Sequence, residues 1–254
     1  VFNTRLGAGY EIADYTLGYN SSNQVKSTQV FFYNDKRASN TAVLESTAMD
    51  TSVSFDGDMS SQLTSFTDLE STKVMGREQV TYYQGASKEE LAHRSVLYDK
   101  EDGATPKETL VYLYGTAKLH AGDPGVDEDT GLRGQVSIRD IDLTKAEADM
   151  VSWDTASVTR AAAAYYRKTR TEFSGYKQEE KPARSWNYSR LNGTTQLSYT
   201  EYIYNAAGED FDLDSETLDY TMTYRNDTKQ RQLSKTVFNT RLGAGYEIAD
   251  YTLG

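Results

Sequence analysis

Two groups of carboxylates are the residues of this chain whose types and spacing best suit a chemical role. Hard oxygen ligands gathered on a loop favour Ca²⁺. The calcium candidates are Asp123, Asp127 and Asp129, beside Glu128, and Asp210, Asp212 and Asp214, beside Glu216. The second group is not an EF-hand, because Ser215 and Thr221 stand where that loop needs glycine and glutamate. A solvated acidic loop is the alternative interpretation of both groups.

Residues suited to catalysis are scarce. The chain has two histidines, His93 and His120, and no cysteine that could join them in a zinc site. Its abundant serine, threonine and aspartate are explained by turns and strand surfaces, so we expect no catalytic triad. Residues 7–11 contain glycine but lack the spacing and the lysine of a phosphate loop. We therefore expect a protein that is not an enzyme and has no cofactor, with calcium as the candidate metal ion.

Composition narrows the range of partners. The chain has 27 Lys and Arg against 38 Asp and Glu, a net charge of -11. Such a chain repels nucleic acid and anionic membrane surfaces, and no apolar run is long enough for a membrane-spanning helix. The 20 tyrosines argue against disorder, because aromatic residues are typical of half-buried strands. An acidic, cysteine-free chain rich in Thr, Ser, Asn and Asp favours an extracellular or cell-surface location.

The same 18 residues occur twice in the chain. Residues 1–18 and residues 237–254 both read VFNTRLGAGYEIADYTLG, which gives a period of 236 residues. A repeat at a fixed period predicts a repeat architecture in which neighbouring copies bury one another's surfaces. We expect further copies of its own repeat as partners, with other chains packed side by side as a further candidate. A deliberately duplicated end segment and a closed ring are the alternatives.

A weaker repeat divides each period into three. Residues 11–34, 90–115 and 180–205 align on shared glutamate and tyrosine positions. These repeat anchors are Glu11, Tyr19 and Tyr33, then Glu90, Tyr98 and Tyr114, then Glu180, Tyr188 and Tyr204. The alignment predicts repeat unit 1 over 1–78, unit 2 with an insertion over 79–168, unit 3 over 169–236, and the start of the next period over 237–254.

Alternating patterns predict about four strands in each unit. Residues 50–55, 134–139 and 219–225 alternate polar and apolar side chains, as a strand with one wet face does. The segments 30–33 and 110–114 are apolar on both faces, which predicts central strands covered on both sides. The insertion at 143–168 contains the best helix signal, because Asp154 suits a cap and Ala156 to Lys168 is rich in helix formers.

The hairpin region resembles the YD repeats of bacterial Rhs-type proteins. The best copy is SVLYDKEDGATPKETLVYLYG at 95–115, where Tyr98, Asp99 and Gly103 fit that pattern. The other two copies depart from it, with Asn20 and Ser189 after the tyrosine, and all three lack the Arg-Leu that follows the glycine. The resemblance implies a large β-sheet wall wound into a shell or tube, and it carries over no catalytic residue.

Together these patterns predict an all-β tandem repeat array, a β-solenoid-like stack or tube wall, with three related four-stranded units in each 236-residue period. The expected function is structural: an extended extracellular filament, tubule or stalk built by stacking of tandem β repeats. One alternative is an adhesin module that binds carbohydrate or another ligand in a closed propeller-like ring. The other is an Rhs-like shell around a separately encoded toxin.

Overall fold

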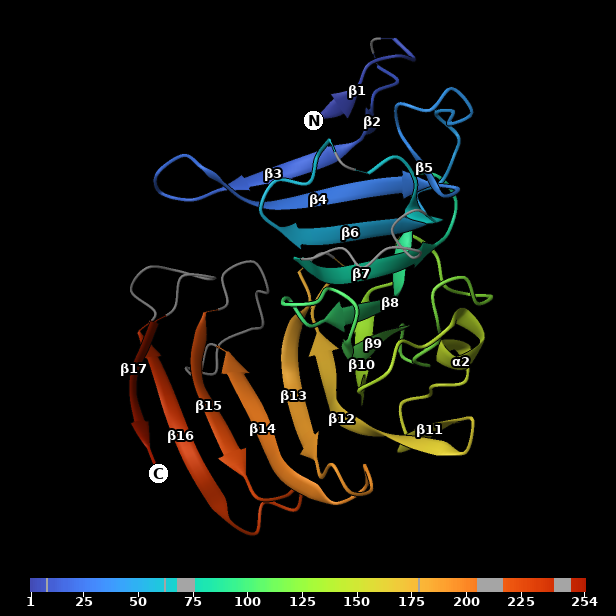
Figure 1. The fold of residues 1–254 in the computed structure, drawn as a ribbon. Coiled ribbons are helices and arrows are strands. Elements are labelled where there is room, and N and C mark those ends of the chain that lie inside the picture. Colours follow the sequence, from blue (N-terminus) through green and yellow to red (C-terminus); the bar gives the residue numbers. More distant parts are fainter. Residues whose placement is uncertain (8, 62, 68–75, 178, 205–216, 240–247) are drawn as a thin grey trace. The chain divides into compact units, whose positions relative to one another are not determined.

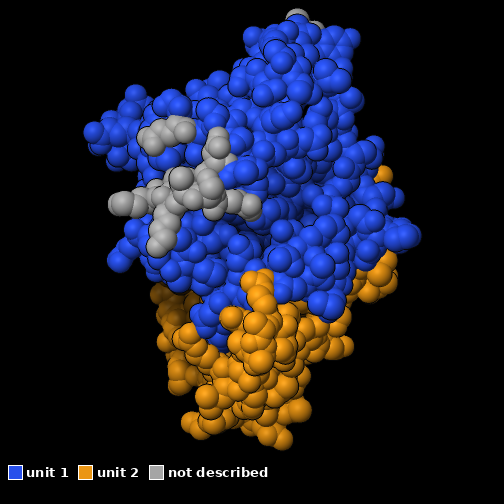
Figure 2. Space-filling model, turned by 45° about the vertical axis from the view of Figure 1, so that its right-hand side comes forward, with its two compact units in different colours: residues 1–112, 120–128, 139–150 blue, residues 113–119, 129–138, 151–254 orange. Residues whose placement is uncertain are grey.

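The computed structural model shows an all-β chain built on a large antiparallel sheet, which confirms the all-β part of the predicted fold class. The tandem repeat array stays a prediction. It describes residues 1–7, 9–61, 63–67, 76–177, 179–204, 217–239 and 248–254. The chain divides into two compact units, residues 1–112, 120–128 and 139–150, and residues 113–119, 129–138 and 151–254 (Figure 2). No helix among the described residues has the length and apolar character that crossing a membrane would require.

The first unit is an antiparallel meander in which β3, β4, β6, β7, β8 and β9 follow one another in space (Figure 1). β1 and β2 pair with each other, and β5 pairs with β4. Its elements are β1 (Phe2–Asn3), β2 (Ile12–Ala13), β3 (Tyr15–Tyr19), β4 (Val25–Tyr33), β5 (Lys36–Arg37), β6 (Thr51–Asp56), β7 (Arg77–Gln84), β8 (Leu91–Tyr98), β9 (Pro106–Tyr114) and α2 (Lys145–Asp149).

A row of valines runs across the buried face of this meander. Val30 lies opposite Val53, Val53 opposite Val80, and Val80 opposite Val96, each on the next strand. All four side chains are fully buried. Directly opposite β-branched side chains pack closely on a pleated surface, so this row stabilises the register of four strands at once.

The second unit continues the same pattern, in the order β10, β12, β13, β14, β15, β16 and β17, with β11 paired to β12. Here the corresponding cross-strand row is cationic and aromatic: Arg170, Trp186, Tyr199 and Tyr224 lie opposite one another in turn. Its strands are β10 (Leu132–Arg139), β11 (Ser157–Arg160), β12 (Ala163–Ser174), β13 (Lys181–Tyr188), β14 (Gln196–Tyr204), β15 (Leu218–Tyr224), β16 (Gln232–Asn239) and β17 (Ile248–Leu253).

The two strands expected to be covered on both faces are buried on one face. In β4 the side chains of Val30 and Phe32 are fully buried, whereas Phe31 between them is only partly buried. β9 alternates in the same way around Tyr112. The prediction of equal cover was wrong because an antiparallel sheet buries one face and leaves the other partly in solvent, even where its side chains are apolar.

The helical insertion is confirmed in one part and wrong in another. α2 lies inside 143–168, and Thr144 caps it in a capping box with Glu147. The alanine-rich stretch that we expected to be helical instead forms the hairpin of β11 and β12. Ala161 and Ala162 make its two-residue turn with φ of 49° and 67°, so strand pairing outweighs the helix propensity of alanine here.

Register shifts recur at the same place relative to the tyrosine anchors. Between β3 and β4, β8 and β9, and β13 and β14, the shift falls immediately before Tyr19, Tyr98 and Tyr188, respectively. The partner pairs β7–β8, β12–β13 and β16–β17 also shift at corresponding positions. A bulge bends its strand and increases the local twist, so the strands of both units bend at matching points.

The turn at Ala161 and Ala162 yields a stability prediction. The left-handed region costs a non-glycine residue about 1 kcal/mol or more, and Asn-Gly is the preferred pair for such a turn. The double variant Ala161→Asn/Ala162→Gly should therefore raise the free energy of unfolding by about 1 kcal/mol, measured by urea denaturation. The control Ala164→Gly, inside β12, should lower it by about 0.5–1 kcal/mol. A less stable Asn-Gly variant would contradict this turn.

Candidate functional site

Two of the tyrosine anchors lie beneath an arginine. The guanidinium carbon of Arg77 is 3.8 Å from the ring centroid of Tyr98, and Arg77 Nε donates to the carbonyl oxygen of Gly103 at 2.6 Å. In the second unit Arg167 lies 3.9 Å from the ring centroid of Tyr188 and donates to the carbonyl of the corresponding hairpin glycine at 3.2 Å. A planar guanidinium can stack on a ring and donate a hydrogen bond at the same time. Each arginine therefore connects its own strand, β7 or β12, to the next hairpin, β8–β9 or β13–β14.

The two hairpin glycines adopt the same backbone conformation. Gly103 and Gly193 have φ of 60° and 63°, and a Cβ on Gly193 would lie 2.1 Å from the carbonyl oxygen of Ala156. The sequence patterns pointed to Gly103 but not to Arg77 or Arg167. A signal existed, because each arginine precedes its tyrosine anchor by 21 residues.

The glutamate anchors bind backbone N–H groups. Glu90 Oε1 accepts the N–H of Met49 at 2.8 Å, and Glu180 Oε1 accepts the N–H of Leu132 at 2.9 Å. Both N–H groups lie where the last strand of the preceding predicted unit begins. Glu11 accepts the N–H of Gly9 within its own loop. The carboxylate of the second and third anchors therefore joins one predicted unit to the one before it.

The remaining tyrosine anchors differ in burial. Tyr33 is buried, and its hydroxyl donates to the carbonyl of Ala13 at 2.8 Å; Tyr204 donates in the same way to Pro182 at 3.1 Å. Each acceptor lies two residues after a glutamate anchor. Tyr114 is also buried. Tyr19 is 56% exposed, so the environment of Tyr98 and Tyr188 is not reproduced at the first copy.

A pair of threonines that no pattern singled out performs a further repeated role. Thr28 Oγ1 donates to the carbonyl of Gly57 at 2.7 Å and accepts the N–H of Met59. Thr109 Oγ1 donates to the carbonyl of Ile141 at 2.6 Å and accepts a backbone N–H two residues later. Each hydroxyl therefore fixes the start of the loop that follows β6 or β10, the last strand of a predicted unit.

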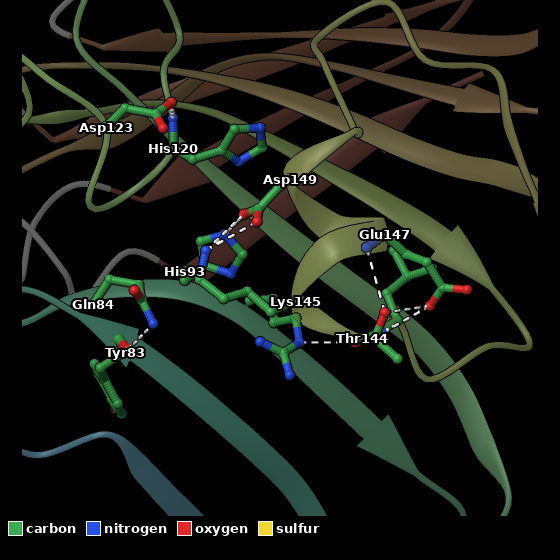
Figure 3. A network of polar contacts seen from close by, with 11 residues as sticks. Tyr83, Gln84, His93, His120, Asp123, Thr144, Lys145, Glu147 and Asp149 are labelled. Carbon is green, nitrogen blue, oxygen red and sulfur yellow. Dashed lines mark hydrogen bonds and ion pairs between the residues drawn. The ribbon is translucent and has the colours of Figure 1, made fainter.

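The two histidines meet in a polar cluster of the first unit (Figure 3). His93, on β8, is fully buried, and its Nε2 lies 2.8 Å from Asp149 Oδ1 at the end of α2. The ring centroids of His93 and His120 are 5.6 Å apart. Lys145 Nζ contacts both carboxylate oxygens of Asp149, and Asp123 Oδ2 accepts the backbone N–H of His120. The cluster therefore attaches α2 and a neighbouring loop to β8.

Burial and hydrogen bonding act in opposite directions on the pKa values of His93 and Asp149. Burial lowers the pKa of His93, and this effect outweighs the hydrogen bond with Asp149, which acts in the opposite direction. Burial alone would raise the pKa of Asp149, but hydrogen bonds from Lys145 and His93 bring it below its usual value. A fully enclosed, neutral imidazole cannot reach a substrate, so the geometry supports a structural role.

The structure does not gather the calcium candidates of the first acidic loop. Asp127 and Asp129 are exposed, while Asp123 is engaged with His120. Within the described ranges, no group of three or more His, Asp or Glu side chains is arranged to hold a metal ion. The second group, Asp210, Asp212 and Asp214, lies outside the described residues, and calcium binding there stays a prediction.

A cavity of about 340 Å³ opens beside the first glutamate anchor. Its lining residues include Tyr10, Tyr33, Glu11, Glu90 and Lys88. Aromatic faces with a few polar groups are the usual lining of small-ligand sites. Glu90 already binds Met49, so part of this polar lining holds the fold together.

The arginine–tyrosine contact predicts a matched pair of effects. Arg77→Lys and Arg167→Lys remove the stacked plane and the Nε donor but keep the charge. Each should lower the free energy of unfolding by about 1–3 kcal/mol in urea denaturation. Arg231→Lys, at an exposed position, is the control and should change it by less than about 0.5 kcal/mol. Equal changes in the free energy of unfolding at all three positions would show that the stacked guanidinium does not stabilise the fold.

The buried histidine predicts a pH dependence. The pKa of His93 is lower in the folded chain than its unfolded value of 6.5, so the unfolded chain binds more protons as the pH falls. Stability is therefore fully present above about pH 6.5 and is lost as the pH falls through the folded pKa. His93→Gln should flatten this slope, measured as urea midpoints between about pH 5 and 7. The same slope in both proteins would contradict a neutral buried His93.

No protein-family model matches the chain, and no curated protein matches it.

Proposed function

We propose that this chain is a segment of a structural protein that builds an extended extracellular filament, tubule or stalk from tandem β repeats. The observation that carries the proposal is the recurrence of the same backbone-directed contacts along the chain. Arginine over tyrosine, glutamate to a strand-initiating N–H, and bulges before the tyrosine anchors all recur at equivalent positions. Such contacts join each predicted repeat unit to the one before it. Repeat arrays gain stability with length through contacts of this kind.

The first glutamate anchor supports growth beyond one period. Glu90 and Glu180 accept N–H groups from the unit before them, whereas Glu11 has the N–H of Gly9, in its own loop. A preceding copy of the repeat would offer Glu11 the same kind of partner that the other two anchors have. The acidic, cysteine-free composition supports an extracellular setting for such a fibre.

A ligand-binding module is the second candidate, and the cavity beside Glu11 favours it. Tyrosine rings and carboxylates could bind the faces and hydroxyl groups of a sugar. In this candidate the repeats close into a ring with a finite number of units, and the cavity is the functional surface.

Electron microscopy of the native material distinguishes the two. The structural role predicts long particles whose axial repeat corresponds to one 236-residue period. Compact, monodisperse particles would reject that role and favour the closed, ligand-binding module.

A further inference from the structure

The cavity beside the first glutamate anchor lies entirely within the first unit and has a volume of about 340 Å³. Four stretches of chain surround it: the segment around β2, the end of β4, and the loops that precede β6 and β8. Two hydrogen bonds join these stretches in pairs, from Tyr33 to the carbonyl of Ala13 and from the N–H of Met49 to Glu90. The cavity is therefore held by the same contacts that hold the fold.

Apolar side chains that the fold leaves partly exposed line this cavity. Ile12, Phe31 and Met49 pack against the buried cluster that contains Tyr33, yet none of the three is fully buried. All three are lining residues. Removing apolar surface from water is favourable, so these side chains favour a ligand with an apolar body.

The charge around the cavity is negative. Its lining residues include Glu11, Glu45, Glu90 and Lys88, and Lys88 Nζ pairs with Glu45 at 3.1 Å. Within the described part of the chain, Glu11 and Glu90 accept backbone N–H groups and pair with no cation. Each N–H occupies one carboxylate oxygen, so the second oxygen of both residues is available to a ligand.

The charge of Glu90 acts on the aromatic residues around it. Burial is the main cause that raises the pKa of Tyr33, and the charges of Glu90 and Asp14 raise it further. Glu90 also raises the pKa of Tyr83, to which burial again contributes most. A carboxylate in such partly apolar surroundings attracts a cation more strongly than a carboxylate in water does.

We propose that this cavity binds an organic cation with an apolar body, such as an alkylammonium or alkylguanidinium group. The apolar body covers Ile12, Phe31 and Met49, and the available oxygens of Glu11 and Glu90 bind the cationic head. A volume of about 340 Å³ is enough for such a small group. A free amine and a lysine or arginine side chain of another polypeptide are the two sources of this chemistry.

Charge distinguishes this ligand from the alternatives. An anion is repelled by the carboxylates and by a chain with a net charge of -11. A neutral sugar would cover the apolar side chains but leave the carboxylate charges uncompensated. The inference does not depend on the structural role, because a filament segment and a closed module would both contain this cavity.

NMR of the methionine methyl groups in the full chain tests the site. Of the five methionines, Met49 is a lining residue and Met222 lies in the second unit. Chain labelled at these methyl groups is titrated with n-butylammonium, with n-butylguanidinium and with n-butanol, a neutral analogue of similar shape. The Met49 signal, assigned with the variant Met49→Leu, should shift and saturate with both cations. Binding of n-butanol should be at least about tenfold weaker, and the Met222 signal should not move.

Glu11→Gln and Glu89→Gln form a matched pair of variants. Both glutamates are exposed, but Glu11 is a lining residue and Glu89 is not. Glu11→Gln removes the charge and keeps an oxygen that can accept the N–H of Gly9, so the loop is retained. It should weaken the binding of n-butylammonium by about 3- to 10-fold, whereas Glu89→Gln should change it by less than about twofold.

Two results would overturn the proposal. One is equal binding of n-butylammonium and n-butanol, and the other is a Met49 signal that no cation moves. A Met49 shift with methyl glucoside alone is an instance of the second result, and it would favour the sugar of the second candidate function. Binding of both n-butylammonium and Nα-acetyl-lysine methylamide would support a polypeptide side chain as the source, and binding of the free amine alone would support a small amine. The filament is tested separately, by electron microscopy.

Discussion

Backbone hydrogen bonding between neighbouring antiparallel strands is the interaction on which this molecule depends. A buried backbone N–H or C=O without a partner costs free energy comparable to a lost hydrogen bond, so each inner strand of a meander needs a partner on both of its edges. Side chains supply partners where the strands stop: Glu90 accepts the N–H of Met49 just before β6, and Arg77 donates to the carbonyl of Gly103 in the next hairpin. Turns and loops are therefore fixed by hydrogen bonds to the backbone, as the strands are.

Contacts to the backbone recur in pairs along the chain, while the side chains of the core vary. The row Val30, Val53, Val80, Val96 is aliphatic, and the row Arg170, Trp186, Tyr199, Tyr224 is cationic and aromatic. Both rows cross the same kind of sheet, because the arginine, glutamate and threonine side chains hold the hairpins and loops in place. They do so through hydrogen bonds to backbone carbonyls and N–H groups. A core can change composition when its volume and register are retained. The weak sequence similarity between the predicted units follows from this division of roles.

Sequence patterns predicted much of the sheet, because alternation and tyrosine spacing are local properties. They located the strands around Val30, Val53, Val136 and Tyr220, and they marked Tyr98 and Tyr188 as equivalent. They misread the segment from Ala156, since helix propensity is a weak preference that pairing with β12 overrides. The arginine partners were missed although each precedes its tyrosine anchor by 21 residues, a spacing that a comparison of the units shows. The His93–Asp149 contact was out of reach of local patterns, because it joins residues 56 positions apart.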